Sequence, residues 1–422
     1  MNQIRRPSSG GKRHQLLGDL GGRPRASDRE HRTPHALPTG FVGIGGAGLS
    51  GYALLARAWG AEVGGWDRVE TPYLGALRGA LVELAPEPVV PEGWDELVVS
   101  TAYRGEVEGR PRAEFLAELI SLQRSIVVAG AHGKTTTAAM IAFCLDRLGD
   151  DPAFLIGGEI PQLGGNARAG KGWLVVEGDE SDRTIAALRP EIAVVTNVDL
   201  DHHAEFASRA EVELLFAEWL EQAPKAVRGE VLDPAEIELG VRGEHNRRNA
   251  SVALATLELA GYPRGEAASV LREFHGAARR LERRGEAGGV EVVDSYAHHP
   301  RELAADIAAT RNGGRILVLF QPHLYSRTRH LAREFGASLA AADVVAVTDI
   351  YRAREQPVEG VTGKLVVDAL AEARPGMDVG WTPTVEDGVR FLARRARSGD
   401  RVLTLGAGDV DRGAALILEA LA

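Results

Sequence analysis

Residues 126–137 read Ile-Val-Val-Ala-Gly-Ala-His-Gly-Lys-Thr-Thr-Thr: an apolar run, a turn with two glycines, a lysine and three hydroxyl residues. An apolar strand that passes through glycines into a helix predicts a phosphate-binding loop, because loop amides and the helix N-terminus both attract an anion. Lys134 is expected to neutralise the phosphates, and Thr135 to place its hydroxyl on a Mg²⁺ ion. Val128 stands where the strict P-loop has its first glycine. The stretch therefore favours an ATP-binding protein; a Gly-Lys-Thr sequence in an ordinary loop is the alternative.

The composition indicates an α/β protein of two or three domains. The chain has 422 residues, of which 44% are hydrophobic and only 5% aromatic. A net charge of −10 argues against general nucleic-acid binding. The single cysteine, Cys144, excludes an internal disulfide framework, fits a reducing cytoplasm and is expected in the core. No apolar run reaches about 18 residues and no signal-like segment opens the chain, so neither a membrane span nor a secretory signal is predicted.

Residues 1–38 differ from the rest of the chain. They hold eight Lys and Arg against three Asp and Glu, with many Gly, Pro and Ser and no sustained periodicity. This composition predicts a disordered basic tail, which would bind an acidic partner or would follow from a start codon assigned too early.

A glycine-rich loop follows the first predicted strand. Gly43, Gly45 and Gly48 satisfy the spacing G-x-G-x-x-G ahead of a helical pattern, and Asp67 ends the next short strand about 20 residues later. This is the fingerprint of a dinucleotide site, yet one such match is weak evidence for NAD. It supports a diphosphate at the N-terminus of this helix.

Two apolar runs after the phosphate loop end in acidic clusters. Residues 173–176 and 192–196 have the pattern of buried parallel strands, and six acids and two histidines lie in the segments 177–182 and 197–203. Acids at the carboxyl ends of strands beside a phosphate loop are placed to hold a nucleotide-bound metal ion. The charges of ordinary surface loops are the alternative.

The last third of the chain alternates strands and helices. A helix opening at 243–249 and a polar hinge at 276–289 are expected before it. Strands are predicted at 290–294, 315–320, 344–349 and 401–405. Polar clusters follow these strands, so one rim of a parallel sheet would gather Tyr296, His298 and Arg327, which suit a carboxylate or a phosphate.

Taken together, these motifs resemble the Mur ligase family, and within it the branch that joins L-alanine to UDP-N-acetylmuramate. They occur in the family's order and cover the chain from about residue 40 to its C-terminus. The strings that carry the resemblance are 41–48, 130–136, 177–182, 196–202, 245–249, 296–300 and 320–329. Seven motifs in one order are far more specific than any one of them.

The resemblance implies an α/β fold of three domains after the tail. A Rossmann-like N-terminal domain (39–124) would bind the UDP-sugar, and a P-loop ATPase-like domain with a parallel sheet (125–284) would bind ATP. A Rossmann-like C-terminal domain (285–422) would bind the amino acid and close over the site. The stretch from Asp201 to Gly243 is shorter than is usual in the family, so the central domain is expected to be trimmed, without some of its strands.

The implied reaction forms an amide between the lactyl carboxylate of UDP-N-acetylmuramate and the amine of L-alanine, for peptidoglycan precursors in the cytoplasm. ATP would phosphorylate the carboxylate with the help of Mg²⁺, and the amine would attack the acyl phosphate. Metals and cations are needed because two anions, a carboxylate and a triphosphate, must first meet. Neither nucleic acid nor a membrane is expected as a partner, and the protein would be a monomer or a homodimer.

The resemblance also carries over to particular residues. The catalytic group would be Lys134, Glu177, His202, His298 and Arg327. ATP would be held by Gly130, His132, Gly133, Lys134, Thr135, Thr136, Asn246, Asn249 and Arg280, with the two asparagines at the adenine. The substrates would be held by Gly45, Ala47, Gly48, Ser50, Asp67, Tyr296, His298 and Arg327. The ligands of Mg²⁺ would be Thr135, Glu177 and His202.

Three positions depart from the family pattern. Leu324 replaces an arginine, Ser295 replaces the second of two aspartates, and Ala297 replaces a glycine. The missing arginine leaves open how the carboxylate of the amino acid is bound.

Three other functions stay open at this stage. They are a ligase that recycles a tripeptide onto the same UDP-sugar, an NAD-dependent oxidoreductase suggested by Gly43–Gly48 and Asp67, and a non-catalytic UDP-sugar sensor. The oxidoreductase leaves Lys134, Glu177 and His202 unexplained, and retention of these residues argues against the sensor.

Overall fold

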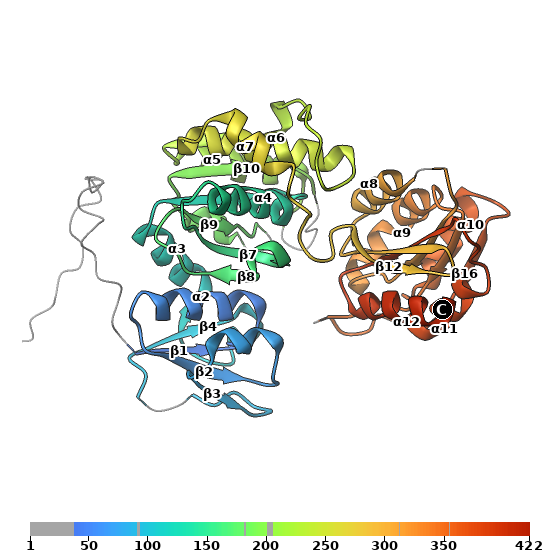
Figure 1. Ribbon diagram of the computed structural model, residues 1–422. Coiled ribbons are helices and arrows are strands. Elements are labelled where there is room, and N and C mark those ends of the chain that lie inside the picture. Colours follow the sequence, from blue (N-terminus) through green and yellow to red (C-terminus); the bar gives the residue numbers. More distant parts are fainter. Residues whose placement is uncertain (1–37, 91–92, 181–182, 201–205, 312, 354) are drawn as a thin grey trace, which may run out of the picture. The chain divides into compact units, whose positions relative to one another are not determined.

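Three β-sheets with their helices follow one another along the chain in the computed structural model (Figure 1). The structure describes residues 38–90, 93–180, 183–200, 206–311, 313–353 and 355–422. Residues 1–37 of the expected tail lie outside the described residues. Within the described ranges, no helix is both long and apolar enough to cross a bilayer.

The first sheet is wholly parallel, in the order β3-β2-β1-β4-β5. Its strands are β1 (Thr39–Val42), β2 (Val63–Asp67), β3 (Leu81–Leu84), β4 (Glu96–Val99) and β5 (Arg110–Pro111), and its helices are α2 (Ala47–Ala58) and α3 (Arg112–Leu122). This strand order is that of a Rossmann-type sheet, as predicted. The glycine loop connects β1, at the centre of the sheet, to α2.

The second sheet has the order β11-β10-β6-β9-β7-β8. Its strands are β6 (Ser125–Ala129), β7 (Ala153–Ile160), β8 (Gly165–Arg168), β9 (Leu174–Glu177), β10 (Ile192–Val195) and β11 (Lys225–Arg228). Its helices are α4 (Lys134–Arg147), α5 (Arg209–Glu221), α6 (Glu244–Ala260) and α7 (Arg264–Leu271). The expectation of a parallel sheet is wrong at one edge, because β8 runs antiparallel to β7. The segment between β11 and α6 is irregular except for a short 3-10 helix, Gly229–Val231. This segment, which the structure describes throughout, contains no strand, and this agrees with the expectation of a shortened central domain.

The third sheet has the order β12-β13-β17-β14-β15-β16. Its strands are β12 (Glu282–Ala287), β13 (Val290–Ser295), β14 (Ile316–Phe320), β15 (Val344–Val347), β16 (Asp378–Trp381) and β17 (Arg401–Leu405). Its helices are α8 (Pro300–Thr310), α9 (Tyr325–Leu339), α10 (Lys364–Ala373), α11 (Val385–Ala393) and α12 (Arg412–Leu421). The stretch expected to be a polar hinge contains β12, which pairs antiparallel with β13, so this sheet is also mixed.

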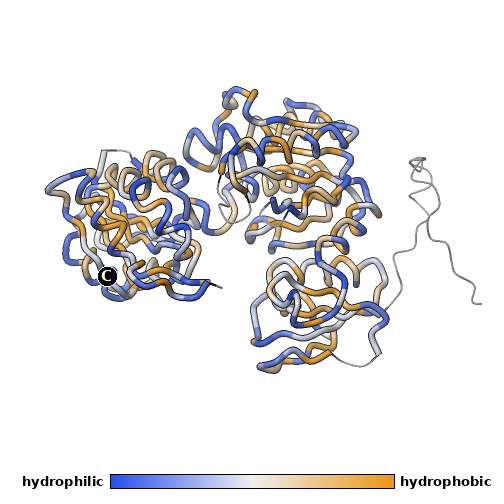
Figure 2. Tube along the Cα trace, turned by 180° about the vertical axis from the view of Figure 1, so that it is seen from behind, coloured by the Kyte–Doolittle hydropathy of each residue, from blue (hydrophilic) through white to orange (hydrophobic). Residues whose placement is uncertain are grey.

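The apolar runs that predicted buried strands form the centres of the sheets. Every residue of β6, β10, β14 and β15 is buried, and Figure 2 shows hydrophobic stretches running through each part of the described chain. Helix α4 is buried from Thr135 to Leu145. Cys144 lies within that stretch, as expected of a core residue, and burial raises the pKa of its thiol to about 12. The phosphate-binding loop is therefore fixed between two buried elements, β6 and α4.

Candidate functional site

The loop between β6 and α4 depends on two glycines in the left-handed region. Gly130 has φ +123° and Gly133, which caps α4, has φ +82°. A Cβ on Gly130 would lie 2.3 Å from Thr196 Oγ1, and one on Gly133 would lie 2.3 Å from Asn249 Oδ1. Both positions thus require glycine for the backbone and for space.

The end of β10 holds this loop by its backbone. The amide of His132 donates to Asn197 Oδ1 at 3.0 Å, and Asn197 Nδ2 donates back to the carbonyl of His132 at 2.8 Å. Thr196 Oγ1 donates to the same carbonyl at 2.7 Å. The Thr196-Asn197 pair therefore fixes the loop, a role that the sequence alone did not assign.

Lys134 is held beneath the loop by three oxygens. Its Nζ donates to the carbonyl of Gly130 at 2.6 Å, to that of Ala131 at 3.4 Å, and to Glu180 Oε1 at 2.8 Å. Burial lowers the pKa of Lys134, but the negative charge of Glu180 and of neighbouring acids outweighs it, and the pKa lies above the usual value. Lys134 is thus a fixed cation, and Glu180, 3% exposed, is its partner.

Thr135 and Glu177 place two oxygens side by side. Thr135 Oγ1 donates to Glu177 Oε1 at 3.1 Å, and Glu177 Oε2 accepts from the amide of Gly157 at 2.7 Å. Arg280 Nη2 lies 3.4 Å from Thr135 Oγ1. A hydroxyl and a carboxylate are the hard oxygen ligands that Mg²⁺ prefers, so the predicted pair fits that ion. His202, the third predicted ligand, lies outside the described residues.

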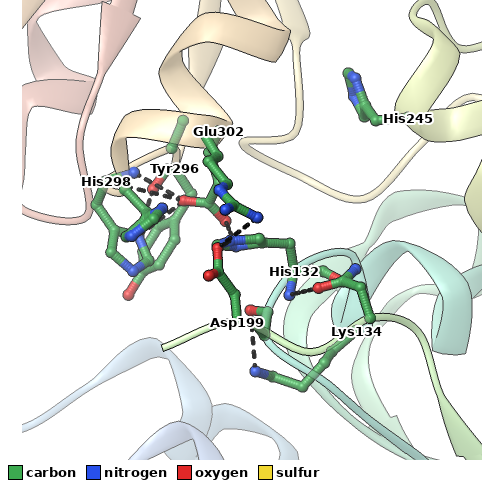
Figure 3. A network of polar contacts seen from close by, with 12 residues as sticks. His132, Lys134, Asp199, His245, Tyr296, His298 and Glu302 are labelled. Carbon is green, nitrogen blue, oxygen red and sulfur yellow. Dashed lines mark hydrogen bonds and ion pairs between the residues drawn. The ribbon is translucent and has the colours of Figure 1, made fainter. Parts of the chain in front are cut away.

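Asp199 and Glu302 approach His132 from two sides (Figure 3). His132 Nε2 lies 3.3 Å from Asp199 Oδ2, and His132 Nδ1 lies 3.6 Å from Glu302 Oε1. Arg301 Nη1 is 3.0 Å from the same Asp199 oxygen. The hydrogen bond from His132, together with Arg301, lowers the pKa of Asp199. Asp199 is one of the six acids noted after the two apolar runs, whereas Glu302 was not singled out from the sequence.

Glu302 also organises the start of α8. Its Oε2 accepts from the backbone amides of His298, at 3.0 Å, and His299, at 3.2 Å. Burial favours the neutral acid, but His298, His132 and Arg280 outweigh it and hold the pKa of Glu302 well below its usual range. Glu302 and His299 form a capping box at the start of α8. The sequence signature of a capping box has Ser, Thr, Asp or Asn at the position of His299, so it does not mark Glu302.

The side chains of Tyr296 and His298 are adjacent, and His323 separates His298 from Arg327. The ring centroids of Tyr296 and His298 are 5.4 Å apart, and those of His298 and His323 are 5.8 Å apart. Arg327 Nη1 is 3.3 Å from His323 Nδ1. The guanidinium carbon of Arg280 lies 5.4 Å from the centre of the Tyr296 ring. The rim predicted after the strands of the third sheet is therefore formed.

Two of the departures from the family pattern have local consequences. Leu324 adopts φ +69° at the start of α9, and its amide donates to the carbonyl of Tyr351 at 3.0 Å. Ser295 donates to Asp306 Oδ2 at 2.5 Å, so a carboxylate from α8 faces the position where the family has aspartate. Burial raises the pKa of Asp306 to about 7. Nothing in the structure gives Ala297 a special role.

The glycine loop of the first sheet is secured by Asp67 and Thr71. Asp67 Oδ2 accepts from the amide of Gly45 at 2.7 Å, Oδ1 accepts from that of Arg68 at 2.7 Å, and Thr71 Oγ1 donates to the carbonyl of Gly45 at 2.6 Å. Both oxygens of Asp67 thus bond the protein's own backbone. This weighs against a ribose-binding acid and hence against the NAD alternative.

Two cavities adjoin the phosphate loop. One of about 400 Å³ includes Ala47, Gly48, Gly133, Lys134, Thr135, Glu177, Arg280, Tyr296 and His298 in its lining. The other, of about 230 Å³, includes His132, Gly133, Thr136, Asn246, Asn249 and Arg280. The structure therefore brings together most of the predicted residues. Five of the predicted residues that the structure describes line neither cavity: Gly45, Ser50, Asp67, Gly130 and Arg327.

Comparisons with known proteins confirm the resemblance. The family profile "Mur ligase middle domain" matches residues 128–229, and "Mur ligase, glutamate ligase domain" matches residues 279–408. The UDP-N-acetylmuramate–L-alanine ligase of Streptomyces coelicolor is 40% identical over 92% of this chain and 96% of its own length. The ligase of the same name from Rubrobacter xylanophilus is 39% identical over 88% and 97%. The crystal structure of the UDP-N-acetylmuramate–alanine ligase of Thermotoga maritima has a TM-score of 0.75 at 24% identity, and the match covers 91% of this chain and 98% of that one. The chain belongs to the Mur ligase family.

Proposed function

We propose that this chain is a UDP-N-acetylmuramate–L-alanine ligase, which uses ATP to make a peptidoglycan precursor in the cytoplasm. The observation that carries the proposal is the cavity of about 400 Å³, in which the Lys134 loop and the Thr135–Glu177 pair face Tyr296 and His298. The 40% identity to a ligase of that name supports the choice of substrates.

The phosphate loop would prepare the first step. Lys134 is fixed by Gly130 and Glu180, so its charge is in place before the triphosphate binds. Mg²⁺ held by Thr135 and Glu177, and a second ion held by His202, would neutralise charge on the phosphates. A lactyl carboxylate oxygen would then attack the γ-phosphorus, and ADP would leave. Positioning and charge neutralisation supply most of the rate enhancement in such a transfer.

The third sheet would serve the second step. The amine of L-alanine attacks the acyl carbon, inorganic phosphate leaves with one former carboxylate oxygen, and the amine loses a proton. His298 lines the cavity, and its Nδ1 lies 3.0 Å from the carbonyl oxygen of Tyr296, which fixes the ring. His298 and Tyr296 would face the acyl phosphate. Arg327, which lies beside His323, would attract the carboxylate of L-alanine.

The remaining sites follow from the two cavities. Adenine would bind beside Asn246 and Asn249 in the cavity of about 230 Å³. The UDP diphosphate would lie at the N-terminus of α2, where Ala47 and Gly48 line the larger cavity. Gly45, Ser50 and Asp67 would shape that loop rather than contact the ligand.

Release of phosphate from ATP tests the proposal. Release should require UDP-N-acetylmuramate, L-alanine and Mg²⁺ together, and should stop when any one is omitted. Release with the tripeptide L-alanyl-γ-D-glutamyl-diaminopimelate but not with L-alanine would instead identify the recycling ligase. Absence of phosphate release with every amino acid tested would indicate a non-catalytic UDP-sugar-binding protein. Reduction of NAD would identify an oxidoreductase.

A further inference from the structure

A cluster of nitrogen and oxygen donors lies beside the phosphate loop, apart from the Thr135–Glu177 pair. His132, Asp199 and His299 each offer one ligand atom, and these atoms lie within 4.8 Å of one another. We propose that these three side chains bind a divalent transition-metal ion such as Zn²⁺. The ion would join the phosphate loop to the residues that start α8.

The donor set favours a transition metal over Mg²⁺. Two imidazoles and one carboxylate suit Zn²⁺, whereas Mg²⁺ prefers oxygen ligands in an octahedral arrangement. The two rings are close, with centroids 4.9 Å apart, and His299 is only 6% exposed. A shift of about 1 Å would bring the three donors to the separation found around a tetrahedral ion.

Glu302 is placed to orient one of the ligands. It faces His132 Nδ1 at 3.6 Å, while His132 Nε2 faces Asp199 at 3.3 Å. A carboxylate on one ring nitrogen and the metal on the other is the usual arrangement around a metal-binding histidine, because the carboxylate fixes the ring and raises its basicity. His132 is therefore oriented as a ligand by a residue outside the ligand set.

Arg301 competes for the site. Its Nη1 lies 3.0 Å from Asp199 Oδ2, so a metal ion would have to displace it. The Asp199 side chain is 12% exposed but that of Arg301 is 65% exposed, so solvent screens the guanidinium and limits the free energy that this ion pair contributes. Displacement of Arg301 by a metal ion therefore costs little free energy, and removal of the guanidinium should strengthen metal binding.

Calorimetric titration of the full chain with Zn²⁺, in a large excess of Mg²⁺ and without nucleotide, tests the proposal. His299→Gln and Asp199→Asn should each weaken the binding by about tenfold or more. Arg301→Met should tighten it, and His275→Gln, at an exposed histidine outside the cluster, should leave it unchanged.

Equal affinity of the wild type and both ligand variants would overturn the proposal, and so would displacement of Zn²⁺ by Mg²⁺. Because His299 precedes α8 and is buried, His299→Gln could fail to fold; Asp199→Asn then decides alone, since asparagine keeps the shape of the side chain. The measurement is independent of ligase activity, so its outcome does not depend on the proposed function.

Discussion

Replacement of Lys134 by Met separates the role of this residue in catalysis from its role in stability. Methionine keeps most of the apolar stem but removes the ammonium that contacts Glu180 at 2.8 Å. Glu180 would be left 3% exposed without its cation. The activity of Lys134→Met should fall by at least about a hundredfold, because the charge that faces the phosphates is gone.

The magnitude of the stability effect follows from the geometry of this pair. Two unit charges 2.8 Å apart attract with about 6 kcal/mol at an effective dielectric constant of about 20, before desolvation is subtracted. Breaking a buried pair at one end costs about 3–5 kcal/mol, much of it from the charge that stays behind. The double variant Lys134→Met/Glu180→Gln should therefore recover roughly 2 kcal/mol of the loss without recovering activity.

Denaturant unfolding and phosphate release, measured on the same preparations, test this reasoning. Lys171→Met is the matched control, since Lys171 is exposed in the same domain, and it should change neither quantity. If the double variant is no more stable than Lys134→Met, the unpaired charge of Glu180 is not what destabilises the single variant, and the reasoning is refuted. Recovery of turnover in the double variant would refute the role of Lys134 at the phosphates.

Three further predictions concern single positions. Gly133→Ala should destabilise the chain by about 2 kcal/mol more than Gly149→Ala, because both have positive φ but only at Gly133 would the Cβ meet Asn249; equal losses in denaturant unfolding would contradict this. Asp306 has a folded-state pKa of about 7, above its unfolded value, so the wild type should lose stability as pH rises from 4 to 7. The advantage of Asp306→Asn, measured by unfolding, should thus grow by roughly 2–3 kcal/mol between pH 5 and pH 8, and a constant difference would argue against a buried neutral acid. Cys144, with its thiol pKa raised to about 12, should resist iodoacetamide at pH 8 until the protein unfolds, as mass spectrometry would show.

The residues of the phosphate site could be predicted because their chemistry is local. A strand, two glycines, a lysine and a threonine specify the loop within twelve residues, and the apolar run before Glu177 and Glu180 places these two acids beside it. The apolar runs themselves located β6, β10 and β14, whose residues are all buried.

Other features could not be read from the sequence because they depend on tertiary contacts. Strand β12 is an edge strand of mostly charged residues, so neither alternation nor an apolar run marks it. Glu302 and Asp306 are ordinary helical acids until α8 places them beside His132 and Ser295. Asp67 matched the dinucleotide spacing, yet its carboxylate bonds the glycine loop itself.

The central claim is that a carboxylate of UDP-N-acetylmuramate is activated as an acyl phosphate and joined to L-alanine. The most direct test uses UDP-N-acetylmuramate labelled with ¹⁸O in its lactyl carboxylate, with ATP, Mg²⁺ and L-alanine. The proposed path transfers one carboxylate oxygen to phosphorus, so mass spectrometry should find one ¹⁸O atom in the released phosphate and the other in the new amide. Phosphate without the label, or amide formation without phosphate release, would contradict the account.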